Sequence, residues 1–531
     1  MTYLGKPISR SCKPEDGLLD PPIASCWTEA HDLLAISNIL TTANPKLGVK
    51  LDDWRQRVND LLAGPMVDDL ATERRLEELA MDFRQQWMIL AHSVVAGEMK
   101  SPPSDHLSIM PVSLSHTFIY ERVLGPWQAE EKLKKTVPVI PGWQNEVTLF
   151  SSGLAAITAA IIALRHLKDK YRRADGHALR LDMFGGYFET LRLLDLLSSL
   201  DLCCQYFQDQ EILFERFSNG KTDILFLELI AYDWIQTVVD PTRLLDALST
   251  RAVDHPWILL VDTTLLGPMF HLGPLLDACG EKKPILVLEI RSGLKLDQVG
   301  LEFSNVGIIR TLTPEDLDTN RYPDAKQFHQ TLKGNRKILG NALTLSQIAI
   351  LDAPWIFHPE WMLKHSLSVL DNNRRLAFAL SGIQGLFSRV NHPGLGPQSG
   401  LSWAESPIVV MEFHAFEDQK DNHDFLLAVI AHEVRKRKLV FHLGASFGFR
   451  HHRCEVINPK GPYCYPDSKL RSFFKVAMGS RNGPSMDGTI KLMQELASYP
   501  HFRALRTAYP EIKPERELAA FPNLRSLRLF R

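Results

Sequence analysis

The chain has 531 residues, of which 45% are hydrophobic and 23% are charged, and a globular chain of this length can bury a large core without disulfides or metals. Its 60 basic and 62 acidic residues leave a formal net charge of −2, which gives no support for a nucleic-acid or anionic-membrane partner. Because the seven cysteines form no Cys-x-x-Cys pair, no metal site and no disulfide framework are expected, and a reduced, cytoplasmic setting fits best. The most apolar long stretch, Leu149–Leu164, is too short and too interrupted to span a bilayer.

Residues 1–110 are expected to form a helical N-terminal extension. Leu51–Leu62 and Thr72–Val95 carry apolar residues at helical spacing, with charged residues between them. Pro102 and Pro103 then interrupt the helical pattern.

Between residues 111 and 345, helical stretches alternate with short apolar runs. The expected strands are Leu179–Met183, Ile224–Leu229, Trp257–Val261 and Pro284–Ile290. The expected helices are Ala155–Lys168, Glu189–Leu200, Pro241–Ser249 and Pro274–Ala278. This rhythm is typical of βαβ units, and apolar runs without polar alternation are typical of strands buried on both faces. The sequence therefore predicts a large α/β domain with a mostly parallel sheet covered by helices.

Residues 346–531 are expected to form a smaller C-terminal α+β domain with a basic tail. Its helical patterns, the first of which begins just before the boundary, are Asn335–Leu351, Trp361–Ser381 and Asp424–Lys438. Its expected strands are Ile408–Phe413 and Phe473–Met478. The arginine-rich tail from 503 to 531 is interpreted as an arm or a solvated helix.

Two candidate functional segments surround glycines. Phe150–Ala155 opens a predicted helix, where free N–H groups and the helix dipole hold anions and Ser152 adds a hydroxyl. An ordinary helix cap is the plainer alternative there. Asp182–Tyr187 follows a predicted strand, and the ring of Phe184 is suited to stacking on a flat cofactor. The alternative for Phe184 is a core aromatic residue before a Gly-Gly turn.

Two further segments supply an acid and an amine. Asp262 ends a predicted buried strand, where a carboxylate is costly unless it is paired, for example with a protonated pyridine nitrogen; the alternative is a cap for the next segment. Lys295 follows the apolar run Ile285–Leu288, and partial burial would lower its pKa enough to make it a nucleophile. Arg291 and Ser292 are suited to assisting a phosphate. A lone lysine after a strand is usually solvated, but the order of the four segments favours pyridoxal 5'-phosphate (PLP) held as a Schiff base on Lys295.

In this order the segments resemble the fold-type-I PLP-dependent enzymes of the Cys/Met-metabolism group, the cystathionine γ-synthase/γ-lyase-like family, over roughly residues 119–496. The motifs that carry the resemblance are Tyr120-Glu-Arg122, Ser151–Ala156, Phe184-Gly-Gly186, Val261–Thr264 and Ser292-Gly-Leu-Lys295. The resemblance implies a mostly parallel seven-stranded sheet in the large domain, a smaller C-terminal α+β domain, and an N-terminal region outside the usual family plan.

The resemblance also implies roles for individual residues. The residues that would hold the cofactor are Ser152, Gly153, Leu154, Phe184, Asp262, Ser292 and Lys295, with Tyr120 and Arg122 contributed across a subunit interface. The residues that would contact substrate are Tyr232, Ser446, Lys475 and Arg481. Since two cofactor ligands would come from a partner subunit, a homodimer or homotetramer is expected.

Departures from the family pattern include four positions. Phe184 stands in place of a tyrosine that is also a candidate acid/base, Tyr232 in place of an asparagine, and Leu294 in place of a threonine. Lys475 stands in place of the arginine that clamps the substrate carboxylate. Because lysine is a point charge and arginine a bidentate fork, this swap predicts a substrate different from the cystathionine-pathway amino acids.

The resulting interpretation is a PLP-dependent lyase or transferase acting on an amino acid, with Lys295, Asp262 and Phe184 as catalytic residues. The family points to β/γ-elimination or β/γ-replacement of a sulfur-, sulfonium- or oxygen-linked substituent. Two alternatives remain: another PLP reaction, such as transamination, decarboxylation or C–C bond formation, and a PLP-fold binding protein that has lost catalysis. His451 and His452, which lie between arginines, are interpreted as part of a solvated basic loop and not as a metal or anion site.

Overall fold

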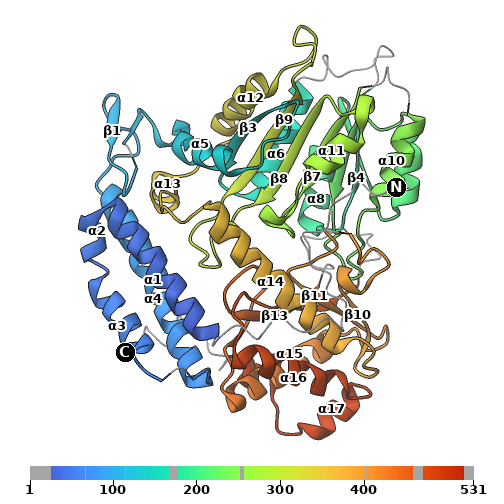
Figure 1. Ribbon diagram of the computed structural model, residues 1–531. Helices are drawn as coiled ribbons and strands as arrows, with labels where there is room; N and C mark the ends of the chain where they lie inside the picture. The colour runs from blue at the N-terminus through green and yellow to red at the C-terminus, as the bar shows by residue number, and fades with distance from the viewer. Residues whose placement is uncertain are drawn as a thin grey trace.

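The computed structural model describes residues 25–65, 67–113, 115–166, 178–251, 256–401, 403–458 and 471–519. Seven strands form a large sheet in the order β3-β9-β8-β7-β6-β4-β5 (Figure 1). Their bounds are β3 Trp143–Phe150, β4 Leu179–Phe184, β5 Leu202–Phe207, β6 Ile224–Glu228, β7 Ile258–Asp262, β8 Leu286–Ser292 and β9 Gly307–Pro314. The neighbouring strands β5, β4, β6, β7 and β8 are parallel to one another. Strand β9 is antiparallel to both of its neighbours, β3 and β8. The expected mostly parallel, seven-stranded sheet is therefore confirmed.

Helices cover both faces of this sheet. The helices on one face are α6 Gly153–His166, α8 Phe188–Leu197 and α12 Ala325–Ile338, and those on the other are α9 Gln210–Ser218, α10 Pro241–Thr250 and α11 Gly273–Ala278. Leu260 and Leu288 belong to the first core, whereas Leu259 and Val287 belong to the second. Successive side chains of a strand point to opposite faces, so the central strands are apolar throughout because both of their faces are buried.

The four expected strands of the large sheet are present as β4, β6, β7 and β8, whereas β3, β5 and β9 were not expected. The strands β3 and β5 are the edges of the sheet, and they carry partly or fully exposed polar residues such as Asn145 and Gln205. Such strands lack the uninterrupted apolar run by which the central strands were found.

The expectation of one long helix over Asn335–Leu351 is wrong. The chain forms α12, which ends at Ile338, and then α13, Leu345–Leu351. Thr344 starts the second helix with a capping box, in which its side chain accepts a hydrogen bond from the backbone N–H of Gln347. The apolar residues keep a helical spacing across this break, but the capping box at Thr344 starts a new helix there.

A second, five-stranded sheet lies in the C-terminal part of the chain, in the order β10-β11-β14-β13-β12. Its strands are β10 Phe387–Asn391, β11 Val409–Phe413, β12 Phe441–Leu443, β13 His452–Ile457 and β14 Phe473–Ala477. The accompanying helices are α14 Pro359–Leu380, α15 Lys420–Arg437, α16 Pro484–Ala497, α17 Phe502–Ala508 and α18 Pro514–Ala519. The strands and helices expected here at 361–381, 408–413, 424–438 and 473–478 are confirmed as α14, β11, α15 and β14.

The first part of the basic tail is not a free arm, because it forms the helices α17 and α18. Leu505 of α17 is buried in the core of the C-terminal part, so the tail is also packed and not wholly solvated. Glu517 of α18 forms an ion pair with Arg435 of α15. The rest of the tail, 520–531, lies outside the described residues.

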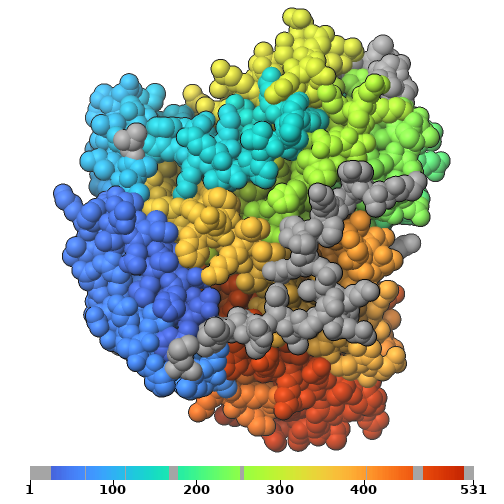
Figure 2. Space-filling view, viewed as in Figure 1, coloured from blue at the N-terminus to red at the C-terminus, as the bar shows by residue number. Residues whose placement is uncertain are grey.

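Four helices precede the large sheet: α1 Ser25–Ala43, α2 Pro45–Val49, α3 Asp52–Leu62 and α4 Leu70–Val95. Their core continues into the rest of the molecule through Trp355, whose ring lies 5.1 Å from that of Trp87. In Figure 2 these helices, in blue, form one flank of the molecule and meet the orange and red C-terminal part. No helix among the described residues is long and apolar enough to cross a bilayer.

The segment between α4 and the sheet holds a small hairpin. It consists of β1 His106–Ser108 and β2 His116–Phe118, followed by the short helix η1 Glu121–Val123 and by α5 Trp127–Thr136. The hairpin stands at the edge of the molecule in Figure 1.

Candidate active site

A cavity of about 380 Å³ lies at the carboxyl ends of β6, β7 and β8. Each of these strands ends in a polar residue that lines the cavity, namely Glu228, Asp262 and Ser292. The opposite wall comes from the C-terminal part of the chain, from Ala445, Ser446 and Phe447. Ligands of open α/β sheets bind in this position, outside the carboxyl ends of the strands.

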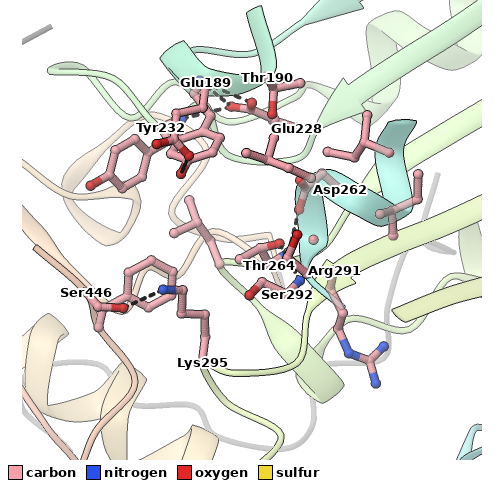
Figure 3. A pocket seen from close by; sticks show the side chains of 18 of the residues that line it. Glu189, Thr190, Glu228, Tyr232, Asp262, Thr264, Arg291, Ser292, Lys295 and Ser446 are labelled. Carbon is pink, nitrogen blue, oxygen red and sulfur yellow. Dashed lines mark hydrogen bonds between the residues drawn. The ribbon is translucent and has the colours of Figure 1, made fainter. Parts of the chain in front are cut away.

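Lys295 lies in the turn that follows β8, and its side chain points into the cavity (Figure 3). The ammonium group Nζ donates a hydrogen bond to Oγ of Ser446 and lies 5.4 Å from the centre of the Phe447 ring. Burial, reinforced by the nearby charge of Lys475, lowers the pKa of Lys295 to about 8. A lysine with this pKa has a substantial neutral fraction near neutral pH and can act as a nucleophile.

Asp262 lines the same cavity as Lys295. The backbone N–H of Thr264 donates to Oδ1 of Asp262 at 2.8 Å, and no basic side chain of the described residues forms an ion pair with Asp262. Burial raises the pKa of this carboxyl group. A protonated ring nitrogen placed here would supply the positive charge that the carboxylate lacks.

Glu228 stands beside Asp262 on the neighbouring strand, in the same register. Its carboxylate accepts hydrogen bonds from the backbone N–H groups of Gly186 and Tyr232, at 2.8 and 3.1 Å. Burial, together with the nearby Asp262 carboxylate, raises the pKa of Glu228 to about 8. Glu228 thus ties together the backbone segments that follow β4 and β6.

The expected phosphate loop lies at the start of α6. Ser152, Gly153 and Leu154 line the cavity together with Ser292. Ser152 also caps α6, because its Oγ accepts a hydrogen bond from the Ala155 N–H at 3.1 Å. The helix cap is therefore confirmed, and the binding of a phosphate stays a prediction. First-turn N–H groups have no partner within their own helix and are available to an anion.

A glycine on β9 allows this loop to lie against the sheet. A Cβ atom at Gly307 would be 2.0 Å from the carbonyl oxygen of Ser152. Gly307 pairs with Phe150 of β3 and with Ser292 of β8. A side chain at position 307 would therefore displace the loop that ends at Gly153.

Phe184 does not line the cavity, which corrects the expectation of a stacking role. It is 1% exposed and packs in the core of the large sheet. The aromatic residues that line the cavity beyond the Gly-Gly turn are Tyr187 and Phe188. The hydroxyl of Tyr187 donates to the carboxylate of Glu189, which also lines the cavity.

Tyr232 and Ser446 line the cavity, whereas Lys475 lies just behind its wall. Lys475 Nζ donates to the Tyr232 hydroxyl at 3.0 Å and to the carbonyl oxygen of Ala445. Burial lowers the pKa of Lys475. The ammonium group of Lys475 is therefore separated from the cavity by the side chain of Tyr232.

The expectation that Arg481 contacts substrate is wrong. Arg481 is 2% exposed, does not line the cavity, and forms ion pairs with Glu29 and Glu77 of the N-terminal helices. The expectation that Arg291 assists a phosphate is also corrected. Its guanidinium forms ion pairs with Asp297 and Glu289 and extends away from the cavity in Figure 3.

Tyr120 and Arg122 do not line the cavity of the single chain. Tyr120 is 42% exposed, and the Arg122 guanidinium lies 5.4 Å from the centre of its ring. Their expected role across a subunit interface stays a prediction.

Sequence reasoning missed the polar cavity residues Glu228, Tyr187, Glu189 and Thr264. For Glu228 a signal was available, because it ends an apolar strand in the way Asp262 does. For Tyr187 and Glu189 the sequence offered only their place after a Gly-Gly turn.

The interpretation of His451 and His452 as a solvated loop is wrong, because they are 9% and 0% exposed. Among the described residues, Glu77, His442 and His451 form the one group of possible ligand atoms that lie within 4.8 Å of one another. Arg453 Nε donates to His451 Nε2 at 2.7 Å, so the ring proton sits on Nδ1 and faces Glu77 at 3.0 Å. This arrangement favours a hydrogen-bonded ion cluster over a metal site.

A scan against protein-family models found no match, and a search of the curated proteins found none either. Among solved structures, cystathionine gamma-lyase from yeast is similar at a TM-score of 0.51 and 16% identity, with 78% of this chain and 98% of that chain covered. The structure of metB from Corynebacterium glutamicum is similar at a TM-score of 0.51 and 16% identity, covering 76% and 91%. The chain therefore has the fold of the fold-type-I PLP-dependent enzymes, as the sequence motifs led us to expect.

Proposed function

We propose that this protein is a PLP-dependent enzyme that acts on an amino acid, with Lys295 as the residue that binds the cofactor covalently. The observation that carries the proposal is that Lys295 and Asp262, from separate strand ends, line one cavity at the carboxyl edge of the sheet. PLP requires a nucleophilic amine and a carboxylate for its ring nitrogen. Lys295 has a lowered pKa, and Asp262 has no ion-pair partner among the described residues.

The cavity fits PLP at three points. The first turn of α6 and Ser292 suit the phosphate, Asp262 suits the ring nitrogen, and Lys295 suits the aldehyde. Leu294, directly before Lys295, stands where the family has a threonine, so this position adds no further hydroxyl for the phosphate. When bound, PLP supplies a cationic ring that accepts electrons from the substrate Cα.

Within this proposal, residues of the chain bind the substrate and transfer protons. Lys295 serves as general base for the Cα proton, and Ser446 orients its amine through their hydrogen bond. Tyr232, backed by Lys475, brings a hydroxyl and a positive charge to the side of the cavity where it can bind the substrate carboxylate. For the proton that a leaving group needs, we propose Tyr187, which lines the cavity and whose hydroxyl donates to Glu189. The buried Phe184 has no hydroxyl for this role.

We favour elimination or replacement at Cβ or Cγ of a sulfur-, sulfonium- or oxygen-linked substituent. The support is the order of motifs shared with the Cys/Met-metabolism family. Incubating the PLP-loaded protein with amino acids that carry such substituents should release thiol, alcohol or the matching nucleophile adduct. Release of CO₂, or amino transfer with the substituent retained, would point to the other PLP reactions. A cofactor spectrum that no amino acid perturbs would support a protein without catalysis.

We further propose a homodimer or a dimer of dimers. The β1–β2 hairpin and the residues after it expose apolar side chains, namely Leu107, Ile109, Ile119 and Tyr120, at 60%, 67%, 55% and 42%. Exposed apolar patches of this kind often mark an interface. A second copy bound here would cover these side chains and bring Arg122 close to a neighbouring cavity.

A further inference from the structure

The loop 444–451, between β12 and β13, joins the cavity to a buried charged cluster. Its first half lines the cavity, where Ser446 accepts the hydrogen bond from Lys295. Its second half carries Arg450 and His451, which are 5% and 9% exposed and do not line the cavity. The position of one half therefore constrains the position of the other.

The middle of the loop 444–451 packs directly on the backbone of Lys295. Gly448 has a φ of +80°, and a Cβ atom there would lie 2.4 Å from the Lys295 carbonyl oxygen. On the far side, the backbone N–H of Arg481 donates to the carbonyl oxygen of Arg450 at 2.9 Å. Since the backbone is held this closely at both places, a displacement of its second half would reach Lys295.

Two carboxylates from the N-terminal helices bind this second half. Glu29 of α1 binds Arg481 at 2.7 and 2.9 Å, and its Oε1 lies 3.4 Å from Arg450. Glu77 of α4 lies 3.0 Å from His451 Nδ1 and 2.7 Å from Arg481. The helices α1 and α4, at the left of Figure 1, thus reach the loop that contacts Lys295.

The ion pairs of this cluster are costly to break because the charged groups are buried. Glu77 and Arg481 are 3% and 2% exposed. Burial alone would raise the pKa of Glu77, but Arg481 and His451 outweigh it and hold that pKa well below its usual value. Removing one partner of such a pair leaves an uncompensated buried charge.

We propose that the N-terminal helices fix the loop 444–451 in the conformation in which Ser446 contacts Lys295. Glu29 and Glu77 are positioning residues, which act on the cavity through the loop and touch neither substrate nor cofactor. The consequence for catalysis rests on the proposed function, whereas the ordering of the loop does not.

The test compares Glu77→Gln with Glu73→Gln. Glu73 is on the same helix, is 0% exposed and also lies within the electrostatic range of Arg481. Its hydrogen bond, however, comes from the backbone of Ser485 in α16 and not from the loop. Hydrogen exchange of the peptide that covers 444–451 should become at least about tenfold faster in Glu77→Gln and stay within about twofold of the wild type in Glu73→Gln. Glu29→Gln provides a second arm, with acceleration expected in the same peptide, in case Glu77→Gln does not fold.

A spectroscopic readout separates positioning from a general loss of stability. In the PLP-loaded protein, the pH midpoint of the cofactor absorbance should move in Glu77→Gln and Glu29→Gln and stay fixed in Glu73→Gln. Only the first two variants alter a contact with the loop that carries Ser446. Unchanged exchange in both loop-contacting variants, or equal acceleration in Glu73→Gln, would overturn the inference. If the wild type binds no PLP, the proposed function fails while the exchange experiment still decides the role of the helices.

Discussion

Burial displaces two pKa values in opposite directions within one cavity. It lowers the pKa of Lys295 and raises that of Glu228, each to about 8, because a low-dielectric site disfavours the charged form of either group. An amine and a carboxyl group with these values both change charge close to neutral pH. The cavity is therefore sensitive to pH in a range that can be tested directly.

The rate at which the protein captures PLP should follow the titration of Lys295. Below pH 8 the amine is mostly protonated and unreactive, so the rate should rise about tenfold per pH unit and level off above pH 8. Lys475→Met removes a positive neighbour and should move this profile to higher pH, whereas Lys364→Met, at an exposed lysine bound to Asp32, should not. Stopped-flow absorbance measures the rate, and a midpoint near that of free lysine would contradict the burial of Lys295.

Glu228→Gln should change how stability depends on pH in the cofactor-free protein. The folded pKa of Glu228 is above its unfolded value of 4.5, so between the two the folded state binds more protons and stability falls as pH rises, by at most about 1.4 kcal/mol per unit. Glutamine does not titrate, so the variant should not lose stability in this way as pH rises. Urea unfolding at pH 5, 6, 7 and 8 should show the variant gaining on the wild type with rising pH, and parallel curves would argue against a shifted pKa.

At the residue scale, the sequence predicted two residues of the cavity correctly for different reasons. Asp262 was found because an acid at the end of a buried strand is costly unless it is paired, and Lys295 was found through its place in the order of the four segments. Phe184 and Arg481 were misplaced because sequence gives no side-chain direction: Phe184 turns into the core, and Arg481 meets carboxylates that lie over 400 positions earlier in the chain.

At the scale of elements, the contact between β9 and the start of α6 makes a specific prediction. Gly307→Ala places a Cβ atom against the Ser152 carbonyl oxygen and should weaken PLP binding at least about tenfold by displacing the phosphate loop, since 1.4 kcal/mol already corresponds to tenfold. Gly334→Ala in α12 meets no atom within 4 Å and should leave binding unchanged. Fluorescence titration with PLP compares the two variants, and equal affinities would show that the loop does not hold the phosphate.

The central elements were predictable because strands buried on both faces leave an uninterrupted apolar run, as in β6, β7 and β8. The edge strands β3 and β5 and the break between α12 and α13 were not predictable in this way. An edge strand is defined by what it pairs with, and the break depends on one capping residue, Thr344, within a continuous helical period. Both are set by local or tertiary contacts that periodicity does not record.

At the scale of the whole molecule, the exposed hairpin predicts self-association. Sedimentation should give at least twice the chain mass of 60.2 kDa. Ile119→Asp, which places a charge on the exposed apolar surface, should shift the protein toward monomer, whereas Leu200→Asp, at a fully exposed leucine remote in sequence from the hairpin, should not. A wild-type monomer that binds PLP fully would contradict the proposed interface and the role of Arg122.

At the same scale, we propose a role for the N-terminal helices, which the sequence left open: they fix the loop 444–451. Apolar periodicity predicted α3 and α4, whereas α1, which carries Glu29, was covered only by the general expectation of a helical extension. Glu77 was one of the charged residues between the apolar positions of α4. Only the fold brings Glu29 and Glu77 to the loop that carries Ser446.

The central claim is that Lys295 binds PLP beside the carboxylate of Asp262, and the absorbance spectrum of the purified protein with PLP tests it most directly. We expect an absorption band near the visible edge that is lost in Lys295→Ala and retained in a surface control such as Lys364→Met. A wild-type protein without this band, or a Lys295→Ala variant that keeps it unchanged, would show that Lys295 does not bind PLP.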